Sequence, residues 1–598
     1  MPSNETPSPV IILPGYSGPQ LFLDAGLATE QQIWAPRVNG VALRSVADVL
    51  LTTLPRLLAD AGGSADAVVE KFGELVPVLE KLGMNEDGSS RYNVSALPRH
   101  AWNSRWDVML ARGQARLNIA QRPTTNTLLD YVPANRIYFF ASDWRLGQVD
   151  GTRALHEYIQ EVKADAGCEK VSLLAVSYGG QLAAAYFAFC GGAEIDRAVL
   201  HAPAIRGSAL TADMLEKRDL TFDHVPLLDL AAVFMQRELS LSQRLKRARR
   251  AELFSEIAAR VIRTHALPPL SRFGSFWDIV PPGDYERLKA LYLDPVKNAE
   301  IIRKSDLVHR EMMPCIGETL RRMQQEGVKL AVIAGTGLPL VGGSPVDSDS
   351  IVDTASATGA FALPLNAEPP AARRHGPHVS PDGRVDAAGA YLPDHTWFFR
   401  GQYHGQAAWD RCARQLYCKW LFTDDIQDIY SDPAFPQFRD SCNPSDGLEL
   451  RFSHSVSGIL TAGDTSLLLT NLSRYDIGLV SVKAEGLALH VPIGGRLTLR
   501  PGETARLPFE AALPAGARRF SLTASFVRRT AVPAREHRAY PFTALPADEE
   551  IPQALRYPGG DQRETPSGHR HNFARDAFVR LRIALPGERK SEEMAHHP

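Results

Sequence analysis

The stretch that decides the fold is Val171-Ser-Leu-Leu-Ala-Val176, followed at once by Ser177-Tyr-Gly-Gly180. The first part is a short, mostly apolar run typical of a buried strand, and a helical pattern begins directly after the glycines. A serine is therefore expected at the apex of a tight turn between a strand and a helix. Small residues two positions before and after it, Ala175 and Gly179, let the two backbones approach closely and expose the serine hydroxyl. The pattern predicts a nucleophilic serine, with alanine at the position that is usually the first glycine.

Working outward, short aliphatic runs alternate with helical patterns over residues 10–422, which predicts a parallel sheet wrapped in helices. Strands are expected at residues 9–14, 136–141, 171–176, 197–202, 329–334 and 396–400. Between the fourth and the fifth strand, residues 210–325 form a helical insertion that is too long for a simple crossover, and we expect it to act as a lid. The fold class is thus α/β, a doubly wound sheet with a helical lid insertion in a domain over residues 1–440.

The pattern changes after Cys442 to alternating strands broken by turn residues. With no helices between them, these strands predict an all-β sandwich domain over residues 445–548. Its strands are expected at residues 448–452, 466–470, 486–491, 496–500 and 519–523. The turn Arg500-Pro-Gly-Glu-Thr504 favours antiparallel pairing of the strands on either side of it. Residues 549–598 are rich in Pro, Arg and His and predict a mostly irregular C-terminal tail.

The charge and the cysteines exclude several classes of protein. The 598 residues carry 66 Lys and Arg against 68 Asp and Glu, a net charge of −2, which gives no electrostatic case for nucleic acid. The six cysteines form no Cys-x-x-Cys pair, so we expect free thiols in a reducing compartment. The first nine residues show no secretory pattern, and no later segment is long and apolar enough to span a bilayer. These features predict a cytoplasmic protein, with signal-independent export or peripheral membrane association as alternatives.

A serine nucleophile needs a histidine as base and an acid that orients the histidine. In a fold of this kind they follow the serine in the order acid, then histidine. His404 lies just past the strand at residues 396–400, at a carboxyl end of the predicted sheet, and is the expected base. For the acid we favour Asp382 in Pro381-Asp-Gly-Arg-Val385, with Asp386 as the alternative.

Three further aspartates, Asp347, Asp349 and Asp353, follow the strand at residues 329–334 in a stretch rich in Ser, Pro and Ala. Their spacing partly matches a calcium-binding loop, but the glycine at the sixth position and the terminal glutamate are missing. We interpret the stretch as a solvated loop. We expect neither a metal nor a cofactor.

Acyl transfer also needs donors for the tetrahedral oxyanion. The amide of Tyr178, directly after the serine, is expected to supply one donor. The amide of Tyr16, in the glycine-flanked turn after the first strand, is expected to supply the other. Phe273, Phe276 and Trp277 in the insertion are expected to bind substrate by lining an acyl-chain cleft, or else to pack the insertion onto the main domain.

These elements occur together in one known family. The chain resembles the lecithin:cholesterol acyltransferase-like family of the α/β-hydrolase superfamily, through elements that run in order over roughly residues 9–422: the turn Pro14-Gly-Tyr-Ser-Gly18, Ser142-Asp-Trp-Arg145, the turn at Ser177, Ala202-Pro-Ala-Ile-Arg-Gly-Ser208, and Asp382-Gly-Arg-Val385 with His404. The resemblance implies a serine acyl-enzyme mechanism on ester-linked acyl chains, with a mobile lid over a lipid-sized cleft.

The sequence therefore predicts a serine hydrolase that cleaves carboxylic esters of lipids, as a lipase, phospholipase or carboxylesterase. A lipid acyltransferase with an alcohol acceptor is one alternative, and a non-catalytic binding protein on a hydrolase scaffold is another. The expected partner is a lipid or other ester substrate, and a protein partner for the β-sandwich is an open alternative. The basic run at residues 243–250 is interpreted as a solvated helix face, with contact to anionic lipid as the alternative.

Overall fold

The structure is a computed structural model of the chain. It describes residues 7–34, 69–70, 80–112, 122–216, 260–341, 344–368, 378–432, 434–441, 448–453, 459–471, 476–493, 497–500, 503–515, 518–528 and 535–544. These residues fall into two compact units, one ending at residue 441 and the other beginning at residue 448. Each unit has its own sheets and its own hydrophobic core.

The first unit is built on a seven-stranded sheet in the order β14-β13-β8-β7-β6-β1-β5. Its strands are β1 (Val10–Leu13), β5 (Ile137–Phe139), β6 (Val171–Val176), β7 (Ile195–His201), β8 (Lys329–Thr336), β13 (Thr396–Arg400) and β14 (Phe438–Asp440). Each neighbouring pair is parallel, so the carboxyl ends of the strands meet at one edge. The six strands expected from the sequence are confirmed, and the edge strand β14 is an addition.

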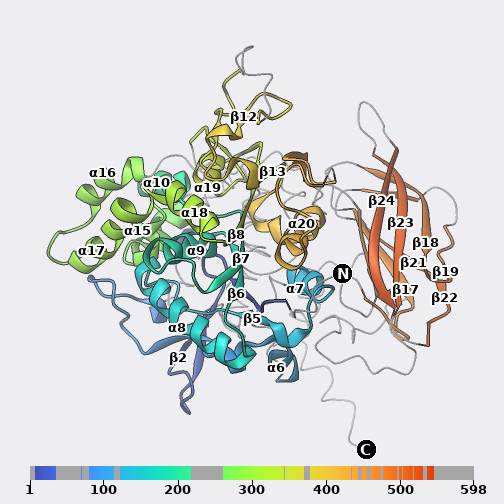
Figure 1. The fold of residues 1–598 in the computed structure, drawn as a ribbon, viewed down its shortest axis with the longest axis horizontal. Helices are drawn as coiled ribbons and strands as arrows, with labels where there is room; N and C mark the ends of the chain where they lie inside the picture. Colours follow the sequence, from blue (N-terminus) through green and yellow to red (C-terminus); the bar gives the residue numbers. More distant parts are fainter. Residues whose placement is uncertain are drawn as a thin grey trace, which may run out of the picture. The chain divides into compact units, whose positions relative to one another are not determined.

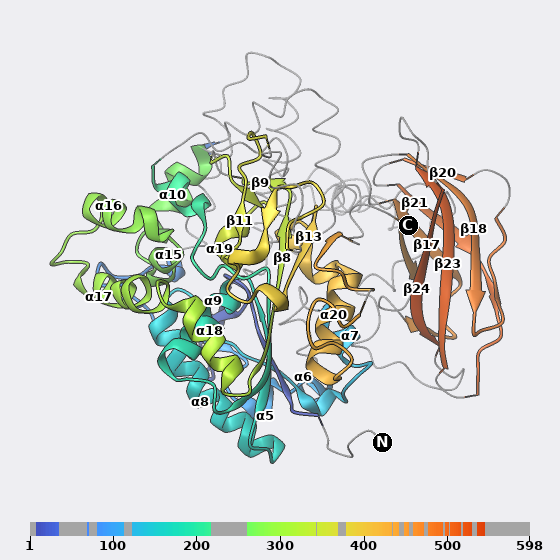
Figure 2. The same ribbon diagram turned by 45° about the horizontal axis from the view of Figure 1, so that its top comes forward.

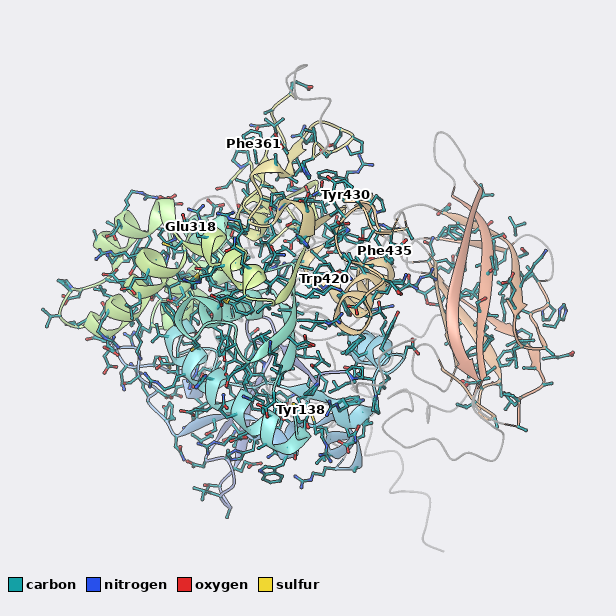
Figure 3. All side chains as sticks on the ribbon, viewed as in Figure 1. Tyr138, Glu318, Phe361, Trp420, Tyr430 and Phe435 are labelled. Carbon is teal, nitrogen blue, oxygen red and sulfur yellow. The ribbon has the colours of Figure 1, made fainter. Side chains whose placement is uncertain are left out.

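Helices cover both faces of this sheet, as Figures 1 and 2 show. One face carries α8 (Gln148–Ala166), α9 (Tyr178–Phe189) and α18 (Ile316–Gln325), and the other carries α7 (Arg122–Leu128) and α20 (Arg411–Phe422). Trp420 of α20, labelled in Figure 3, packs against Trp397 of β13 with the ring centroids 5.6 Å apart. The central strands β1 and β6 are almost entirely apolar and buried because both faces of the sheet are covered.

A small antiparallel sheet in the order β3-β2-β4 follows β1 and was not expected from the sequence. The elements between β1 and α8 are β2 (Gln20–Leu23), β3 (Gln31–Trp34), η2 (Glu80–Leu82), β4 (Val94–Leu97), α5 (Ala101–Ser104), α6 (Trp106–Ala111), α7, η4 (Ala134–Arg136) and β5. The strands of this sheet are only four residues long, too short to carry a periodic signal.

The described part of the expected insertion at residues 210–325 consists of helices joined by short turns. Its elements are α10 (Ala209–Leu215), the π-helices η5 (Ile262–Ala266) and η6 (Val308–Met312), α14 (Leu267–Leu270), α15 (Gly274–Asp278), α16 (Pro282–Tyr292), α17 (Ala299–Leu307) and α18. Side chains of α10, α14, α15, α16 and α17 share one buried hydrophobic cluster with Leu21 of β2 and Trp144, whereas those of η6 and α18 belong to the cluster around α9. The described helices are therefore part of the core of the first unit. The basic run at residues 243–250 lies outside the described residues.

Short elements follow β8 and carry the chain to α20. They are β9 (Leu338–Pro339), β10 (Asp347–Ser348), α19 (Thr354–Thr358), β11 (Phe361–Ala362), β12 (Val385–Asp386), η8 (Ala387–Gly389), η9 (Pro393–His395) and η10 (His404–Trp409). Cys412, at the start of α20, is disulfide-bonded, whereas Cys168, Cys190, Cys315 and Cys418 are free thiols. The expectation of free thiols is therefore wrong for Cys412.

The second unit consists of strands. They are β15 (Leu448–Phe452), β16 (Ile459–Leu460), β17 (Ser466–Asn471), β18 (Ile477–Glu485), β19 (Leu489–His490), β20 (Leu497–Leu499), β21 (Thr504–Pro508), β22 (Glu510–Ala511), β23 (Arg518–Arg528) and β24 (Arg535–Ala544). They form a three-stranded sheet β15-β17-β21, a five-stranded sheet β16-β24-β23-β18-β20 and the pair β19-β22. Buried residues of the two larger sheets, such as Phe452 and Leu522, belong to one hydrophobic cluster.

The turn at residues 500–504 does not join an antiparallel pair as expected. β20 pairs with β18 and β21 pairs with β17, so this turn carries the chain from one sheet to the other. The partner of β20 is β18, a strand that the sequence did not predict. An irregularity between Leu479 and Ser481 breaks the alternation of buried and exposed residues along β18, so its pattern is not that of a regular strand. Residues 549–598, the expected tail, lie outside the described residues. Among the helices that the structure describes, none has the length and apolar character needed to cross a bilayer.

Candidate active site

Ser177 lies in the turn between β6 and α9, where a nucleophile was expected. Its backbone has φ 57° and ψ −119°, a conformation that side chains rarely adopt. The main chain fixes this turn, because the Ser177 amide donates to the carbonyl oxygen of His201 (2.9 Å) and the Ser177 carbonyl accepts from the amides of Gly180 (2.8 Å) and Ala204 (3.1 Å). The hydroxyl is therefore presented at a fixed point beside the carboxyl edge of the sheet.

The two glycines after Tyr178 allow the helix to approach the sheet. A Cβ on Gly179 would lie 2.5 Å from the carbonyl oxygen of Leu13, at the end of β1. A Cβ on Gly180 would lie 2.4 Å from Cβ of Pro203. Neither position has room for a side chain, whereas Ala175 fits within β6 and is fully buried. The close packing inferred from the small residues in this motif is thus present at atomic scale.

His404 joins the serine to a carboxylate. The residue begins η10, after a loop of three residues that follows β13, and its Nε2 lies 2.7 Å from Ser177 Oγ. Its Nδ1 lies 2.6 Å from Oδ2 of Asp349. Because a carboxylate only accepts hydrogen bonds, Nδ1 must carry the proton and Nε2 is left to accept from the serine hydroxyl. This tautomer is the one that a general base requires.

Asp349 is held rigidly in a turn after β10. Its Oδ1 accepts from the amides of Ile351 (3.1 Å) and Val352 (2.8 Å), while Oδ2 faces His404. Its main-chain carbonyl also accepts from the His404 amide at 2.8 Å, so the two residues are bonded at both backbone and side chain. The Asp349 side chain is 3% exposed. The interpretation of this stretch as a solvated loop is therefore wrong.

Asp382, the acid favoured from the sequence, does not lie at this position. Its Oδ1 accepts from the hydroxyl of Ser380 (2.6 Å) and the amide of Arg384 (3.2 Å), and Oδ2 lies 3.6 Å from Arg400. The alternative, Asp386, accepts from the amide of Ala388 at 3.0 Å as the cap of η8. The structure thus brings Ser177 and His404 together with Asp349, and each of the two expected acids stabilises its own turn.

The order of the strands favours the loop that holds Asp349, although it does not choose among the aspartates of that loop. β8 and β13 are neighbours in the sheet, so the loop after β8 and the loop that carries His404 leave the same edge side by side. Asp349 lies in the first of these loops. Gly335 of β8 makes room for it, because a Cβ there would lie 2.6 Å from Asp349 Cβ.

Asp347 fixes the start of the same turn. Its carboxylate accepts from the hydroxyls of Thr336 (2.5 Å) and Thr354 (2.6 Å) and from the amide of Gly337 (3.1 Å). Burial raises the pKa of Asp347, and it also raises the pKa of Asp353 to about 6. In the described part of the chain, these aspartates are not arranged as a metal site.

The two expected oxyanion donors flank the serine. Gly15 touches it, since a Cβ on Gly15 would lie 3.1 Å from Ser177 Cβ and 3.5 Å from its Oγ. The next residue is Tyr16, and Tyr178 is the first residue of α9, where amides have no partner within the helix. No described residue accepts a main-chain hydrogen bond from either amide. Their role as oxyanion donors remains a prediction.

Phe273, Phe276 and Trp277 lie in the core of the first unit. Their side chains are 2%, 3% and 0% exposed and belong to the cluster that the insertion shares with Trp144. Trp277 Nε1 also donates to the carbonyl oxygen of Ser271 at 2.8 Å. This burial favours packing of the insertion over contact with substrate, which stays a prediction.

A second histidine lies near the site but carries no charge. His201 ends β7 and is 1% exposed, and burial lowers its pKa to about 4. A neutral His201 places no positive charge beside the site.

Comparisons with known proteins add the following. No family model matches the chain, and no curated protein matches it in sequence. Among solved structures, one chain of a Tle4–Tli4 complex is similar at 13% identity and a TM-score of 0.33, covering 70% of this chain and 98% of that one. An esterase from Rhodococcus sp. ECU1013, RhEst1, is similar at 15% identity and a TM-score of 0.23, and the match covers 50% of this chain and 86% of the esterase chain. The Bacillus licheniformis lipase BlEst2 in its propeptide form is similar at 10% identity and a TM-score of 0.23, and the match covers 69% of this chain and 87% of the lipase chain.

Proposed function

We propose that the chain is a serine hydrolase of the α/β-hydrolase superfamily in which Ser177, His404 and Asp349 form a catalytic triad. The observation that carries the proposal is the His404 ring, whose two nitrogens lie 2.7 Å from Ser177 Oγ and 2.6 Å from Asp349 Oδ2. The chain order of serine, acid and histidine and the strained turn between β6 and α9 support it.

The geometry supports the following steps. Ser177 Oγ attacks the ester carbonyl carbon while His404 Nε2 takes its proton, and Asp349 stabilises the resulting imidazolium. The amides of Tyr16 and Tyr178 stabilise the oxyanion. When the tetrahedral intermediate collapses, His404 returns the proton to the leaving alcohol and the acyl group stays on Ser177. Water then attacks the acyl-enzyme with His404 as base, which releases the carboxylic acid and restores the serine.

As substrates we propose carboxylic esters of lipids, which makes the chain a lipase, phospholipase or carboxylesterase. The support is the resemblance to the lecithin:cholesterol acyltransferase-like family, carried by Asp143-Trp-Arg145 and the Pro14–Gly18 turn. The same acyl-enzyme gives an acyltransferase when an alcohol replaces water, so an acceptor alcohol belongs in every assay. For the second unit we propose a β-sandwich accessory module, supported by the hydrophobic cluster that its two larger sheets share.

Labelling with a fluorophosphonate tests the proposal, because this reagent reacts with an activated serine. We expect Ser177 to be labelled in the parent. We expect Ser177→Ala and His404→Ala each to lose ester hydrolysis by a similar factor, about 10⁶-fold in kcat, with the double variant little worse than either single one. The control is Ser172→Ala, which removes a buried hydroxyl from β6 that has no hydrogen-bond partner among the described residues, and this variant should keep turnover near the parent value.

Two results would contradict the proposal. Folded parent protein that is not labelled at Ser177 would favour a binding protein on a hydrolase scaffold. Losses that multiply strictly in the double variant would mean that Ser177 and His404 act independently.

A further inference from the structure

The loop at residues 15–19 lies against the nucleophile with no space to spare. A Cβ on Gly15 would approach Ser177 Cβ to 3.1 Å, and Ser17 has a positive φ of 58°. Within the loop, the Gly18 amide donates to the Gly15 carbonyl at 3.0 Å, the bond of a tight turn. A turn of this length needs contacts from outside to keep one geometry.

Two tryptophan indoles supply such contacts. Trp34 Nε1, at the end of β3, donates to the carbonyl oxygen of Ser17 at 2.7 Å. Trp144 Nε1, in the segment after β5, donates to the carbonyl oxygen of Pro19 at 3.2 Å. The side chain of Trp144 is 5% exposed, so this bond is shielded from water. The two indoles thus hydrogen-bond to two carbonyl oxygens of the loop, one from β3 and one from the segment after β5.

Ring contacts connect the two indoles to Tyr16 and, through Tyr16, to Tyr178. Tyr16 packs on Trp144 with centroids 5.2 Å apart, and Trp34 meets Trp144 edge-on at 5.5 Å. Tyr16 also meets Tyr178 edge-on at 5.3 Å. One continuous set of four rings therefore links the loop, the start of α9 and the small sheet. The Tyr16 and Tyr178 side chains are thereby held in contact with each other, beside the nucleophile turn.

We propose that Trp34 and Trp144 are positioning residues of the oxyanion hole, which hold the Tyr16 amide at the distance that the oxyanion requires. This inference rests on the proposed function. Oxyanion donors act only when they are already aimed 2.7–3.1 Å from the developing charge, and a displacement of about 1 Å can cost about 10²-fold in rate. Neither indole touches the reacting atoms, so each acts through the loop.

The test replaces each indole with a ring that cannot donate. We expect Trp34→Phe and Trp144→Phe each to lower kcat about tenfold with KM within about twofold of the parent. The inhibition constant of a trifluoromethyl ketone, which forms a tetrahedral oxyanion on the serine, should rise by the same factor as kcat falls. The acid limb of the pH profile should not move, because His404 is unaffected.

Trp420→Phe is the matched control. Trp420 is 1% exposed, and its Nε1 donates to the main-chain carbonyl of Lys329 at 3.3 Å, at the amino end of β8, whereas the site lies at the carboxyl ends of the strands. Its replacement should change kcat and the inhibition constant less than twofold. Gly18→Ala displaces the loop without touching either tryptophan, since its Cβ would lie 2.9 Å from the Gly15 carbonyl oxygen. It should reproduce the Trp34→Phe signature even if that variant folds poorly.

Each contrary result has one meaning. If Trp34→Phe and Trp144→Phe behave like Trp420→Phe, or if KM rises while kcat holds, the indoles do not position an oxyanion donor. If Gly18→Ala leaves both constants unchanged, the loop carries no such donor and the proposal is overturned. If Ser177→Ala keeps parent activity, the proposed function fails instead, and the two failures are distinguishable.

Discussion

At the scale of single residues, the clearest choice is between Asp349 and Asp382 as the carboxylate that orients His404. Asp349 faces His404 and is nearly fully buried, whereas Asp382 caps a turn that also contacts Arg400. A carboxylate whose second oxygen is fixed by two backbone amides has one orientation, and it passes that orientation to the imidazole.

We expect Asp349→Asn to lower kcat for ester hydrolysis by about 10⁴-fold, because an amide at this position favours the wrong tautomer of His404. Asp382→Asn is the control and should stay within a few-fold of the parent, with a small loss of stability. Steady-state kinetics on a soluble ester measures both. A large loss for Asp382→Asn together with a small one for Asp349→Asn would return the acid role to Asp382.

The sequence identified a site residue where several features of the chain restrict the same position, and it did not where many residues of the same type fit equally well. Ser177 could be found because the strand, the small residues and the helix restrict that position together. His404 could be found because it closely follows a strand. Asp349 could not be separated from Asp347 and Asp353, because what distinguishes it is a pair of backbone amides in an irregular turn, which leaves no periodic pattern in the residues around it.

At the scale of elements, the contact between α9 and the loops after β1 and β7 depends on glycine. We expect Gly180→Ala to lower the free energy of unfolding by about 1–3 kcal/mol and to reduce activity, since its Cβ would lie 2.4 Å from Pro203 Cβ and 2.9 Å from its Cα. Gly283→Ala in α16 is the control, because a Cβ there meets nothing within 4 Å. Urea unfolding of both variants measures the difference.

The expected result for Gly283→Ala is no loss of stability, or a gain of up to about 1 kcal/mol, because alanine favours helix. Equal destabilisation by the two substitutions would mean that the tight contact at Gly180 relaxes without cost.

A buried carboxyl group makes the docking of the insertion sensitive to pH. Asp278, at the end of α15, accepts from the Gln148 amide of α8 (2.6 Å) and the Ser305 hydroxyl of α17 (2.8 Å). Burial is the main cause that raises the pKa of Asp278 to about 7; the hydrogen bonds from Gln148 and Ser305 oppose this rise, and of the nearby charges Asp150 adds to it and Lys304 opposes it. In the unfolded chain the same group titrates near pH 4. Between these two values the native state therefore binds more protons than the unfolded state.

Because of that difference, the contribution of Asp278 to the free energy of unfolding is highest below pH 4 and falls as the pH rises toward 7. The scale is about 1.4 kcal/mol per unit of pKa difference, a few kcal/mol in all. We expect Asp278→Asn to remove this part of the pH dependence, measured by urea unfolding of parent and variant from pH 4 to pH 8. Parallel curves for the two proteins over that range would contradict the assignment.

At the scale of the whole molecule, two hydrophobic cores predict two unfolding transitions. Leu173 of β6 and Leu522 of β23 are both 0% exposed but belong to different clusters. We expect Leu173→Ala and Leu522→Ala each to destabilise one calorimetric transition by about 2–5 kcal/mol and to leave the other in place. At 25 °C, Leu522→Ala should keep the ester hydrolysis of the parent. A single transition that both variants shift equally would show that the two units unfold as one.

The backbone conformation of Ser177 lowers the stability of the fold while it serves the proposed chemistry. Ser177 keeps a backbone conformation suited to glycine, which costs on the order of 1–3 kcal/mol and persists because three main-chain hydrogen bonds enforce it. A mutation to glycine would relieve that strain and at the same time remove the hydroxyl that attacks the substrate. Selection for a stable fold alone would therefore favour glycine at position 177, and the protein would lose its activity. Only selection for the chemistry can keep a serine side chain there.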